Sequence, residues 1–310
     1  MAEFDVVVVG SCNMDLISYV PRLPKPGETI HGHKFSLGFG GKGANQCVMA
    51  ARLGAATAMV AKVGDDVFGN NFIQNFKDNG VNVDHVQVTK EAATGVAPIA
   101  VNDDGQNSII IVSGANLKLT AADVREHESV VTHAKVLICQ LEIQPETSLE
   151  ALRIAKQHGV TTILNPAPAQ ATLDPELYKV SDIFCPNETE AEILTGLPVT
   201  TVEEAEKAAD VLLDKGCKKV IITLGEKGCL CKSSKSEKGI HVPARKVSPV
   251  DTTGAGDAFV GSLAYYMACH KDLRLEEAIQ KACHISSISV CSPGTQTSFP
   301  YRKDLPQDLF

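Results

Sequence analysis

The sequence contains no tryptophan, and aromatic residues make up only 5% of its 310 positions. A pocket that holds a nucleobase as part of its substrate usually needs aromatic or other large apolar side chains. The composition therefore argues against a nucleoside as the substrate.

Long apolar runs and blocks of basic residues are also missing. The longest apolar stretch near the start, Val6–Val9, is far too short for a membrane span or a signal peptide and is typical of a buried strand. The 29 Lys and Arg residues against 37 Asp and Glu residues give a formal net charge of −8. We therefore expect neither a membrane nor a nucleic acid as a partner.

The ten cysteines do not form a metal-binding pattern. Only Cys229 and Cys231 lie close together in the sequence, and no two pairs have the spacing of a zinc site. We expect reduced thiols in the core of a cytosolic protein. No export signal is visible, so the expected location is the cytoplasm, with entry into the nucleus left open.

Short strand-like runs alternate with helical patterns along the chain. The strand-like runs span 4–10, 57–64, 136–142, 160–165, 182–187 and 219–225, and the helical patterns begin near Gly43 and cover 67–79, 146–158 and 202–215. This alternation predicts right-handed crossovers and an α/β fold with a mostly parallel sheet flanked by helices. Hydrophobic residues make up 44% of the chain, enough for the core of one large domain or two.

Two regions, about 16–36 and 94–112, interrupt this alternation. They lack a helical period and carry hairpin signals, notably Asp103-Asp104-Gly105. We expect the two regions to join in one small β-sheet beside the main sheet. Ordinary surface hairpins are the alternative.

The segment Asp251–Phe259 reads DTTGAGDAF and places three small residues and a carboxylate at the start of an expected helix. Gly254, Ala255 and Gly256 carry little side-chain bulk, so a phosphate can reach the unpaired N–H groups of the helix N-terminus. Asp257 beside this cradle suits a base that takes a proton from a hydroxyl group as its oxygen attacks phosphorus. A glycine turn followed by an ordinary first-turn aspartate is the alternative for this segment alone.

A second glycine-rich segment, Gly38–Gln46, also precedes a helical pattern. Its spacing fits the GxGxxG fingerprint of dinucleotide-binding proteins, but the preceding HGHKFSL is polar and shows no compact strand, which argues against NAD binding. Lys42 and Asn45 instead suit a ligand rich in hydroxyl groups, with the glycines allowing close approach. A helix-packing turn with a solvent-facing lysine is the alternative.

Polar residues follow several of the expected strands. Asn13 and Asp15 come after the first strand, and Glu142, Asn187 and Gly225 come after later ones. Open α/β sheets bind ligands at the carboxyl ends of their strands. We therefore expect a sugar to be bound by amide and carboxylate groups that pair with its hydroxyls. The predicted set is Asn13, Asp15, Gly41, Lys42, Asn45 and Glu142, any one of which also fits a turn or strand-end cap.

Taken together, these segments resemble the ribokinase-like (phosphofructokinase-B-type) sugar kinase family over nearly the whole chain. The resemblance rests on an ordered set of motifs: Asn13-Met14-Asp15, the GGKGANQ segment that begins at Gly40, Thr94–Ala97, Gly114–Asn116, Gln140–Glu142, Asn165–Pro168, Asn187–Glu190, Thr223–Gly228, the DTTGAGD segment and Gly294–Gln296. It implies one Rossmann-like kinase domain over residues 1–310 with a lid formed by the two interrupting regions. It also implies phosphorylation of D-ribose at O5 by ATP and a homodimer formed through the lid sheet.

The resemblance also assigns the nucleotide and metal ions. For ATP it implies Asn187, Thr223, Gly225, Gly228, Gly256 and the helix near Cys283, where the family often has asparagine. Mg²⁺ would be held through water by Glu190, because magnesium keeps most of its waters. K⁺ would lie beside the anion cradle at Asp251, Thr253, Ser289, Ser292, Gly294 and Ser298.

Other functions remain open at this stage. A kinase of the same fold acting on deoxyribose, fructose or another sugar fits most of the same residues, although Lys42 in GGKGAN favours ribose. A nucleoside kinase fits less well for the reason given above, and a non-catalytic sugar-binding relative conflicts with the intact Asp257. Sugar-dependent release of ADP discriminates a kinase from a binding protein.

Overall fold

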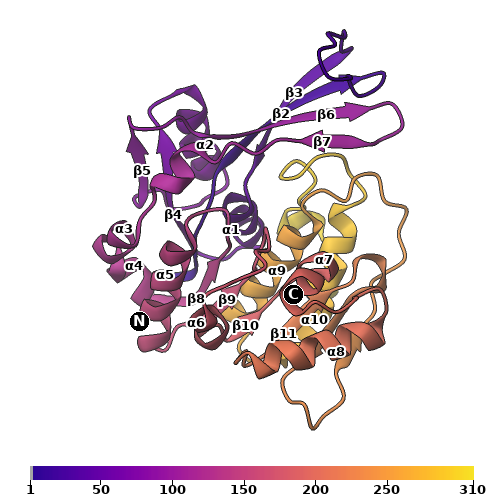
Figure 1. The fold of residues 1–310 in the computed structure, drawn as a ribbon. Coiled ribbons are helices and arrows are strands. Elements are labelled where there is room, and N and C mark those ends of the chain that lie inside the picture. The colour runs from indigo at the N-terminus through magenta and orange to yellow at the C-terminus, as the bar shows by residue number, and fades with distance from the viewer. Residues whose placement is uncertain (1–2) are drawn as a thin grey trace.

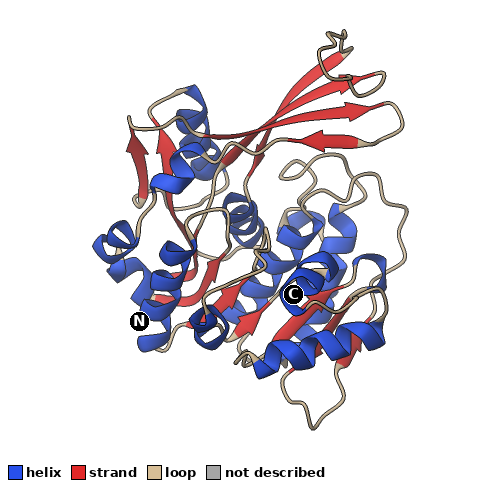
Figure 2. Ribbon diagram, viewed as in Figure 1, coloured by secondary structure: helices blue, strands red, loops and turns tan. Residues whose placement is uncertain are grey.

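A nine-stranded sheet runs through the protein, and helices cover both of its faces (Figures 1 and 2). The computed structural model describes residues 3–310. The strand order is β13-β12-β11-β10-β9-β8-β1-β4-β5, and all neighbouring strands from β11 to β5 are parallel. This arrangement confirms the expected α/β fold with a mostly parallel sheet.

The strands of the main sheet are β1 Phe4–Val9, β4 Thr57–Gly64, β5 Val86–Thr89, β8 Ala134–Cys139, β9 Thr161–Leu164, β10 Ile183–Phe184, β11 Val220–Thr223, β12 Cys229–Lys232 and β13 Ile240–Val242. The last two pair antiparallel at one edge and were not expected. They are short, and the chain between them is rich in lysine, serine and glycine, so the sequence offers little apolar pattern there.

The α-helices are α1 Lys42–Arg52, α2 Val67–Asp78, α3 Ala121–Glu126, α4 Glu128–Thr132, α5 Pro145–Gln157, α6 Pro175–Val180, α7 Glu188–Thr195, α8 Val202–Asp214, α9 Ala255–Cys269 and α10 Leu275–Ser289. Short 3-10 helices span η1 Gly114–Lys118, η2 Gly225–Lys227, η3 Arg302–Asp304 and η4 Gln307–Leu309. None of the helices within residues 3–310 is both long and apolar enough to cross a membrane.

The alternating side chains of β1 show how the two helical layers are held. Val6 and Val8 point into a core formed with α1, α2, α9 and α10. Val7 and Val9 point to the opposite face, into a core formed with α3 to α8. A strand buried on both faces reads as a continuous apolar run, which explains the four valines in a row.

The smaller sheet has the order β3-β2-β6-β7 and projects from the main body (Figure 1). Its strands are β2 Asn13–Val20, β3 Lys34–Gly40, β6 Gly95–Asn102 and β7 Asn107–Ile109. β2 pairs antiparallel with β3 and parallel with β6, so two segments far apart in the sequence form one sheet. A small sheet separate from the main one was expected from the sequence.

One detail of the sequence analysis was wrong. No strand was expected before Gly41, but β3 leads directly into α1. β3 alternates Phe35, Leu37 and Phe39 with Lys34 and small residues, a period-2 pattern typical of a strand exposed on one face. Because β3 belongs to the small antiparallel pair rather than to a βαβ unit, it does not restore the dinucleotide-binding interpretation.

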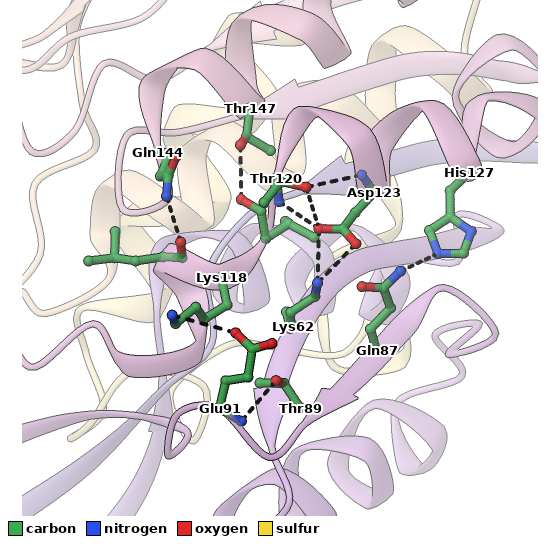
Figure 3. A network of polar contacts seen from close by, with 12 residues as sticks. Lys62, Gln87, Thr89, Glu91, Lys118, Thr120, Asp123, His127, Gln144 and Thr147 are labelled. Atoms are coloured by element: carbon green, nitrogen blue, oxygen red, sulfur yellow. Dashed lines mark hydrogen bonds and ion pairs between the residues drawn. The ribbon is translucent and has the colours of Figure 1, made fainter.

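Ion pairs and helix caps fasten the helical layer beside β4 (Figure 3). The ammonium group of Lys62 on β4 lies 2.9 Å from both carboxylate oxygens of Asp123 on α3. Asp123 also closes a capping box with Thr120 at the start of that helix. Thr147 of α5 donates to the carbonyl of Leu119, which ties α5 to the turn that precedes α3.

Candidate active site

The predicted base, Asp257, lies in the first turn of α9 and is almost fully buried. Gly254 is the N-cap of this helix with a φ of +79°, and a Cβ at this position would lie 2.5 Å from Thr295 Cγ2. Only glycine fits such a left-handed and crowded position. The sequence DTTGAGD therefore begins a helix whose free N–H groups and one carboxylate lie together.

A cavity of about 140 Å³ opens in front of this helix start. Its lining residues come from the carboxyl ends of strands and from helix starts, and they are Lys42, Asn165, Cys185, Asn187, Glu190, Thr223, Thr252, Gly254, Ala255, Gly256, Asp257 and Val260. A larger hollow of about 380 Å³ lies at the amino ends of β9 and β10, beside Lys156 and Asp182, and contains none of the predicted residues. Chemistry rather than volume marks the smaller cavity as the candidate site.

Two neighbouring amides on α1 hold the Asp257 carboxylate. Asn45 Nδ2 donates to Oδ2 at 2.9 Å, and Gln46 Nε2 donates to Oδ1 at 2.9 Å. The glycine-rich segment and the GAGD segment, more than 200 residues apart, thus meet at one carboxylate.

Glu142 joins two other residues of the predicted sugar set, Asn13 and Lys42, and also binds Ser11, which was not predicted. Its Oε2 accepts from Ser11 Oγ at 2.6 Å, from Asn13 Nδ2 at 3.4 Å and from the backbone N–H of Lys42 at 2.8 Å. Gly41, the N-cap of α1, has a φ of +84°, and its missing side chain lets this turn pass close to the backbone of Asn13. The residues expected after separate strands therefore share one carboxylate.

Asn13 and Asp15 lie within β2 of the small sheet rather than in a loop after β1. A Cβ at Gly40 would lie 2.6 Å from the Asp15 carboxylate oxygens, so this glycine makes room for them. Burial, and then repulsion by Glu142 and Asp257, raise the pKa of Asp15 to about 7. The Asp15 carboxylate therefore lies near two other carboxylates. A buried acid with a perturbed pKa is typical of a ligand-binding or catalytic site.

This raised pKa predicts a pH-dependent cost in stability. Between pH 4 and 7 the folded protein keeps a proton on Asp15 that the unfolded chain releases, so rising pH lowers the free energy of unfolding until both states are ionised above pH 7. Asp15→Asn stays neutral, and we expect it to be more stable than the unmodified protein at pH 8, on the order of 2 kcal/mol. Denaturant unfolding of both proteins at pH 8 and pH 4 measures their free energies of unfolding. If the two proteins differ in free energy of unfolding by the same amount at both pH values, this prediction is contradicted.

Lys42 contributes to the site in two ways. Its backbone N–H binds Glu142, while its side chain lines the cavity. Burial lowers the pKa of Lys42, but attraction to Asp257, Glu142 and Glu190 outweighs this, and the pKa is raised. The lysine therefore remains a fixed positive charge among three carboxylates rather than a solvent-facing side chain.

Asn187 and Glu190 form a capping box at the start of α7. Asn187 Oδ1 accepts from the N–H of Glu190 at 2.8 Å, and Glu190 Oε2 accepts from the N–H of Asn187 at 2.9 Å. Burial is the largest cause of the raised pKa of Glu190. One Glu190 oxygen lies outside this cap, and the residue lines the cavity.

The remaining predicted nucleotide residues lie near the end of β11. Thr223 forms an isolated parallel β-bridge with Asn187, and it lines the cavity. Gly225 and Gly228 enclose the turn η2, and Gly228 has a φ of +92° with Val242 O only 2.0 Å from where a Cβ would lie. Cys283 is buried on α10, with its sulfur 3.6 Å from Cys229 Sγ, and does not line the cavity.

The residues predicted for K⁺ lie in the loop before Gly254, at the last residue of α10 and in the loop after α10. Asp251 links these loops, because its carboxylate accepts from the N–H of Thr253 and from the N–H of Gly294, both at 2.9 Å. Ser289, Ser292 and Ser298 complete the set, with Ser298 Oγ bonded to Thr295 O at 2.8 Å. A donor set of one carboxylate with hydroxyl and backbone oxygens suits a hard monovalent cation.

No cluster of three or more His, Cys, Asp or Glu residues able to hold a metal occurs between residues 3 and 310. Magnesium commonly keeps most of its waters in protein sites, and the Glu190 oxygen outside the cap fits such a water-mediated contact.

Several residues at the site received no role in the sequence analysis, namely Ser11, Gln46, Asn116, Gln140, Asn165 and Gln296. Asn116 Nδ2 donates to Asn13 Oδ1 at 2.8 Å, and Gln296 Nε2 donates to Asn45 Oδ1 at 3.0 Å. Through these buried hydrogen bonds, Asn116 and Gln296 hold the side chains of Asn13 and Asn45 in place. Their motifs were visible in the sequence, but a buried amide has no pattern that separates it from a turn or cap residue.

Comparison with known proteins decides the family. The model of the pfkB family carbohydrate kinases matches residues 3–302. The chain belongs to the pfkB family of carbohydrate kinases. This carbohydrate kinase is 56% identical to mouse (Mus musculus) ribokinase over 305 residues, which cover 98% of this chain and 94% of the mouse protein. It is 44% identical over 296 residues to a deoxyribokinase of Salmonella typhi, covering 96% of this chain and 95% of that protein.

The fold of this carbohydrate kinase is similar to that of solved ribokinases. The structure of Arabidopsis thaliana ribokinase complexed with ribose and ATP superposes with a TM-score of 0.90 at 36% identity, covering 98% of this chain and 97% of that one. A ribokinase from Giardia lamblia superposes with a TM-score of 0.87 at 30% identity, covering 96% of each chain.

Proposed function

We propose that this carbohydrate kinase transfers the γ-phosphoryl group of ATP to O5 of D-ribose. The observation that carries the proposal is that Asp257 and the N–H cradle of Gly254–Gly256 line one cavity together with Lys42. The N–H of Lys42 binds Glu142, which also accepts from Asn13, so the predicted sugar residues adjoin this cavity. The relatives named ribokinase, and the plant enzyme described with ribose and ATP, support the choice of both substrates.

In the proposed reaction Asp257 accepts the proton of the ribose O5 hydroxyl as this oxygen attacks the γ-phosphorus. The O5–H bond breaks as the O5–P bond forms, and the bond from phosphorus to the β,γ-bridging oxygen of ATP breaks to release ADP. The N–H groups at the start of α9 stabilise the negative charge on the transferring group, and Lys42 adds a fixed positive charge. Asn13, Asp15 and Glu142 orient the sugar through its hydroxyls.

Asn187, Thr223, Gly225 and Gly228 form the side of the site that we assign to the nucleotide, with the adenine towards α10 near Cys283. Glu190 would hold Mg²⁺ through water, and the ion would neutralise phosphate charge. Asp251, Thr253, Ser289, Ser292, Gly294 and Ser298 would hold K⁺, which would fix the loops beside Gly254. All ten cysteines are free thiols, which fits the reducing cytoplasm.

A second candidate substrate is 2-deoxyribose, favoured by the 44% identity to a deoxyribokinase. Coupled measurement of ADP formation with ribose, deoxyribose, fructose and a nucleoside, first in potassium and then in sodium, separates these substrates. We expect the highest kcat/KM for ribose. A higher kcat/KM for deoxyribose would make deoxyribose the preferred substrate in place of ribose. If none of the sugars increases ADP formation, the proposal is contradicted.

We also propose that two copies pair through one face of the small sheet, which acts as a lid. Side chains alternate across a strand, so Asn13 and Asp15 share one face, while Leu16, Phe35 and Leu37 lie on the other. Phe35 is 61% and Leu37 53% exposed. Exposed apolar side chains on one face favour a partner, and the opposite face remains free to cover the sugar.

Sedimentation analysis tests this pairing. Leu37→Asp places a charge on the apolar face, and we expect it to shift the protein from dimer to monomer. Ser36→Asp introduces the same charge on the opposite face of β3 and serves as the matched control, which should remain dimeric. A monomeric unmodified protein, or equal behaviour of the two variants, would overturn the proposal.

A further inference from the structure

Gln46 on α1 is fully buried, and its side-chain amide has a partner for each polar atom. Its Nε2 donates to Asp257 Oδ1 at 2.9 Å and to Asn165 Oδ1 at 3.0 Å. Its Oε1 accepts from Gln140 Nε2 at 2.6 Å. Because the Asp257 carboxylate only accepts hydrogen bonds when ionised, the nitrogen of the Gln46 amide must face it. Gln140 and Asn165 therefore fix the amide in the one orientation that donates to Asp257.

Close helix packing brings Gln46 within reach of α9. A Cβ at Gly261, one turn after Asp257, would lie 2.5 Å from the carbonyl oxygen of Gln46. The absence of this side chain lets α1 lie directly against α9, and the two helices share an extensive apolar core. The amide of Gln46 is thus fixed relative to Asp257 by backbone packing as well as by its hydrogen bonds.

The two donors to Asp257 differ in what surrounds them. Asn45 holds Oδ2 and is one of the residues predicted to bind the sugar. Gln46 holds Oδ1, and all of its other polar contacts are to buried protein groups, Asn165 and Gln140. A sugar hydroxyl arriving at Oδ2 can replace the contact with Asn45 without disturbing the contact with Gln46.

We propose that Gln46 is a positioning residue that anchors Oδ1 of Asp257, so that Oδ2 faces the reacting hydroxyl group. The proposal rests on the proposed role of Asp257 as the base. Gln140 acts on Asp257 indirectly, because its Nε2 donates to Gln46 Oε1 and so orients the Gln46 amide. The Oε1 of Gln140 has no hydrogen-bond partner among residues 3–310.

The test replaces Gln46 by methionine, which has nearly the same shape but cannot donate to Asp257. We expect kcat for sugar phosphorylation to fall by about 10–100-fold, while KM for ribose and for ATP changes less than about 3-fold. The acid limb of the pH profile of kcat should move to higher pH by about one unit, because the ionised carboxylate loses a donor. Gln157→Met, the same change at the exposed end of α5, is the matched control and should leave kcat unchanged.

A double-mutant cycle separates positioning from general damage. In an Asp257→Asn background the further change Gln46→Met should lower kcat by less than about 2-fold, because the anchored carboxylate is already absent. An equal loss in both backgrounds, or wild-type kcat and pH profile in the single variant, would overturn the inference. Near-normal turnover of Asp257→Asn alone would instead exclude Asp257 as the base, and the inference about Gln46 would fail with it.

Gln140→Met provides a second variant if Gln46→Met does not fold, as judged by thermal melting. It leaves Gln46 and Asp257 in place and removes only the bond that orients the Gln46 amide. We expect a smaller loss of kcat, about 3–10-fold, with the same shift of the acid limb. An unchanged pH profile in this folded variant would overturn the proposed chain of contacts.

Discussion

Asp257→Asn lowers kcat for sugar-dependent ADP formation by at least about 100-fold, the scale expected for removal of a positioned base. The asparagine has nearly the same volume and remains in the first turn of α9, but its side chain does not take up the hydroxyl proton. Steady-state kinetics with ribose and ATP measure the loss, and equilibrium binding of each substrate should stay within about 3-fold of the unmodified protein.

Asp272→Asn is the matched control, because the same change is made in the exposed turn after α9. It should keep full activity. Near-normal turnover of Asp257→Asn would exclude Asp257 as the base, whereas loss of substrate binding together with turnover would assign it a binding role instead.

Asp15→Ala raises KM for ribose by about 100-fold or more, with a much smaller effect on KM for ATP. A site built to pair with substrate hydroxyls loses specificity when a buried partner is removed. The carboxylate lies on the small sheet near Glu142, and Asp15 is not among the residues that line the cavity with Asn187 and Thr223. Initial rates over a wide range of ribose concentrations measure the change.

Asp15→Asn is the graded comparison for this prediction. It keeps a hydrogen-bonding side chain of the same size, so the rise in KM should be smaller, about 10-fold. Unchanged KM for ribose in Asp15→Ala, or an equal rise in KM for ATP, would contradict the assignment of this residue to the sugar.

The fold was predictable because its main signals are periodic. The four valines of β1 and the alternation of strands with amphipathic helices led directly to a mostly parallel sheet. The strand β3 was missed because its polar positions hid a period-2 pattern. The antiparallel strands β12 and β13 were missed because they are only four and three residues long, too short to show a periodic pattern.

The grouping of candidate site residues was predictable where they are close in the chain. Gly254, Gly256 and Asp257 lie within four positions, and the structure places them together at the start of α9. The sequence does not indicate that Asn45 and Gln46 would each hold one oxygen of Asp257, since this depends on how α1 packs against α9. Contacts between distant segments are set by tertiary packing, and a single sequence does not encode them as a motif.

The chemical identity of the product tests the central claim most directly. Phosphorus NMR of a mixture of the protein, magnesium ATP and ribose labelled with carbon-13 at C5 should show ADP together with a new phosphomonoester whose phosphorus couples to the labelled carbon. Release of inorganic phosphate without a sugar ester, or a phosphomonoester whose phosphorus does not couple to the labelled C5, would contradict transfer to O5 at the Asp257 site.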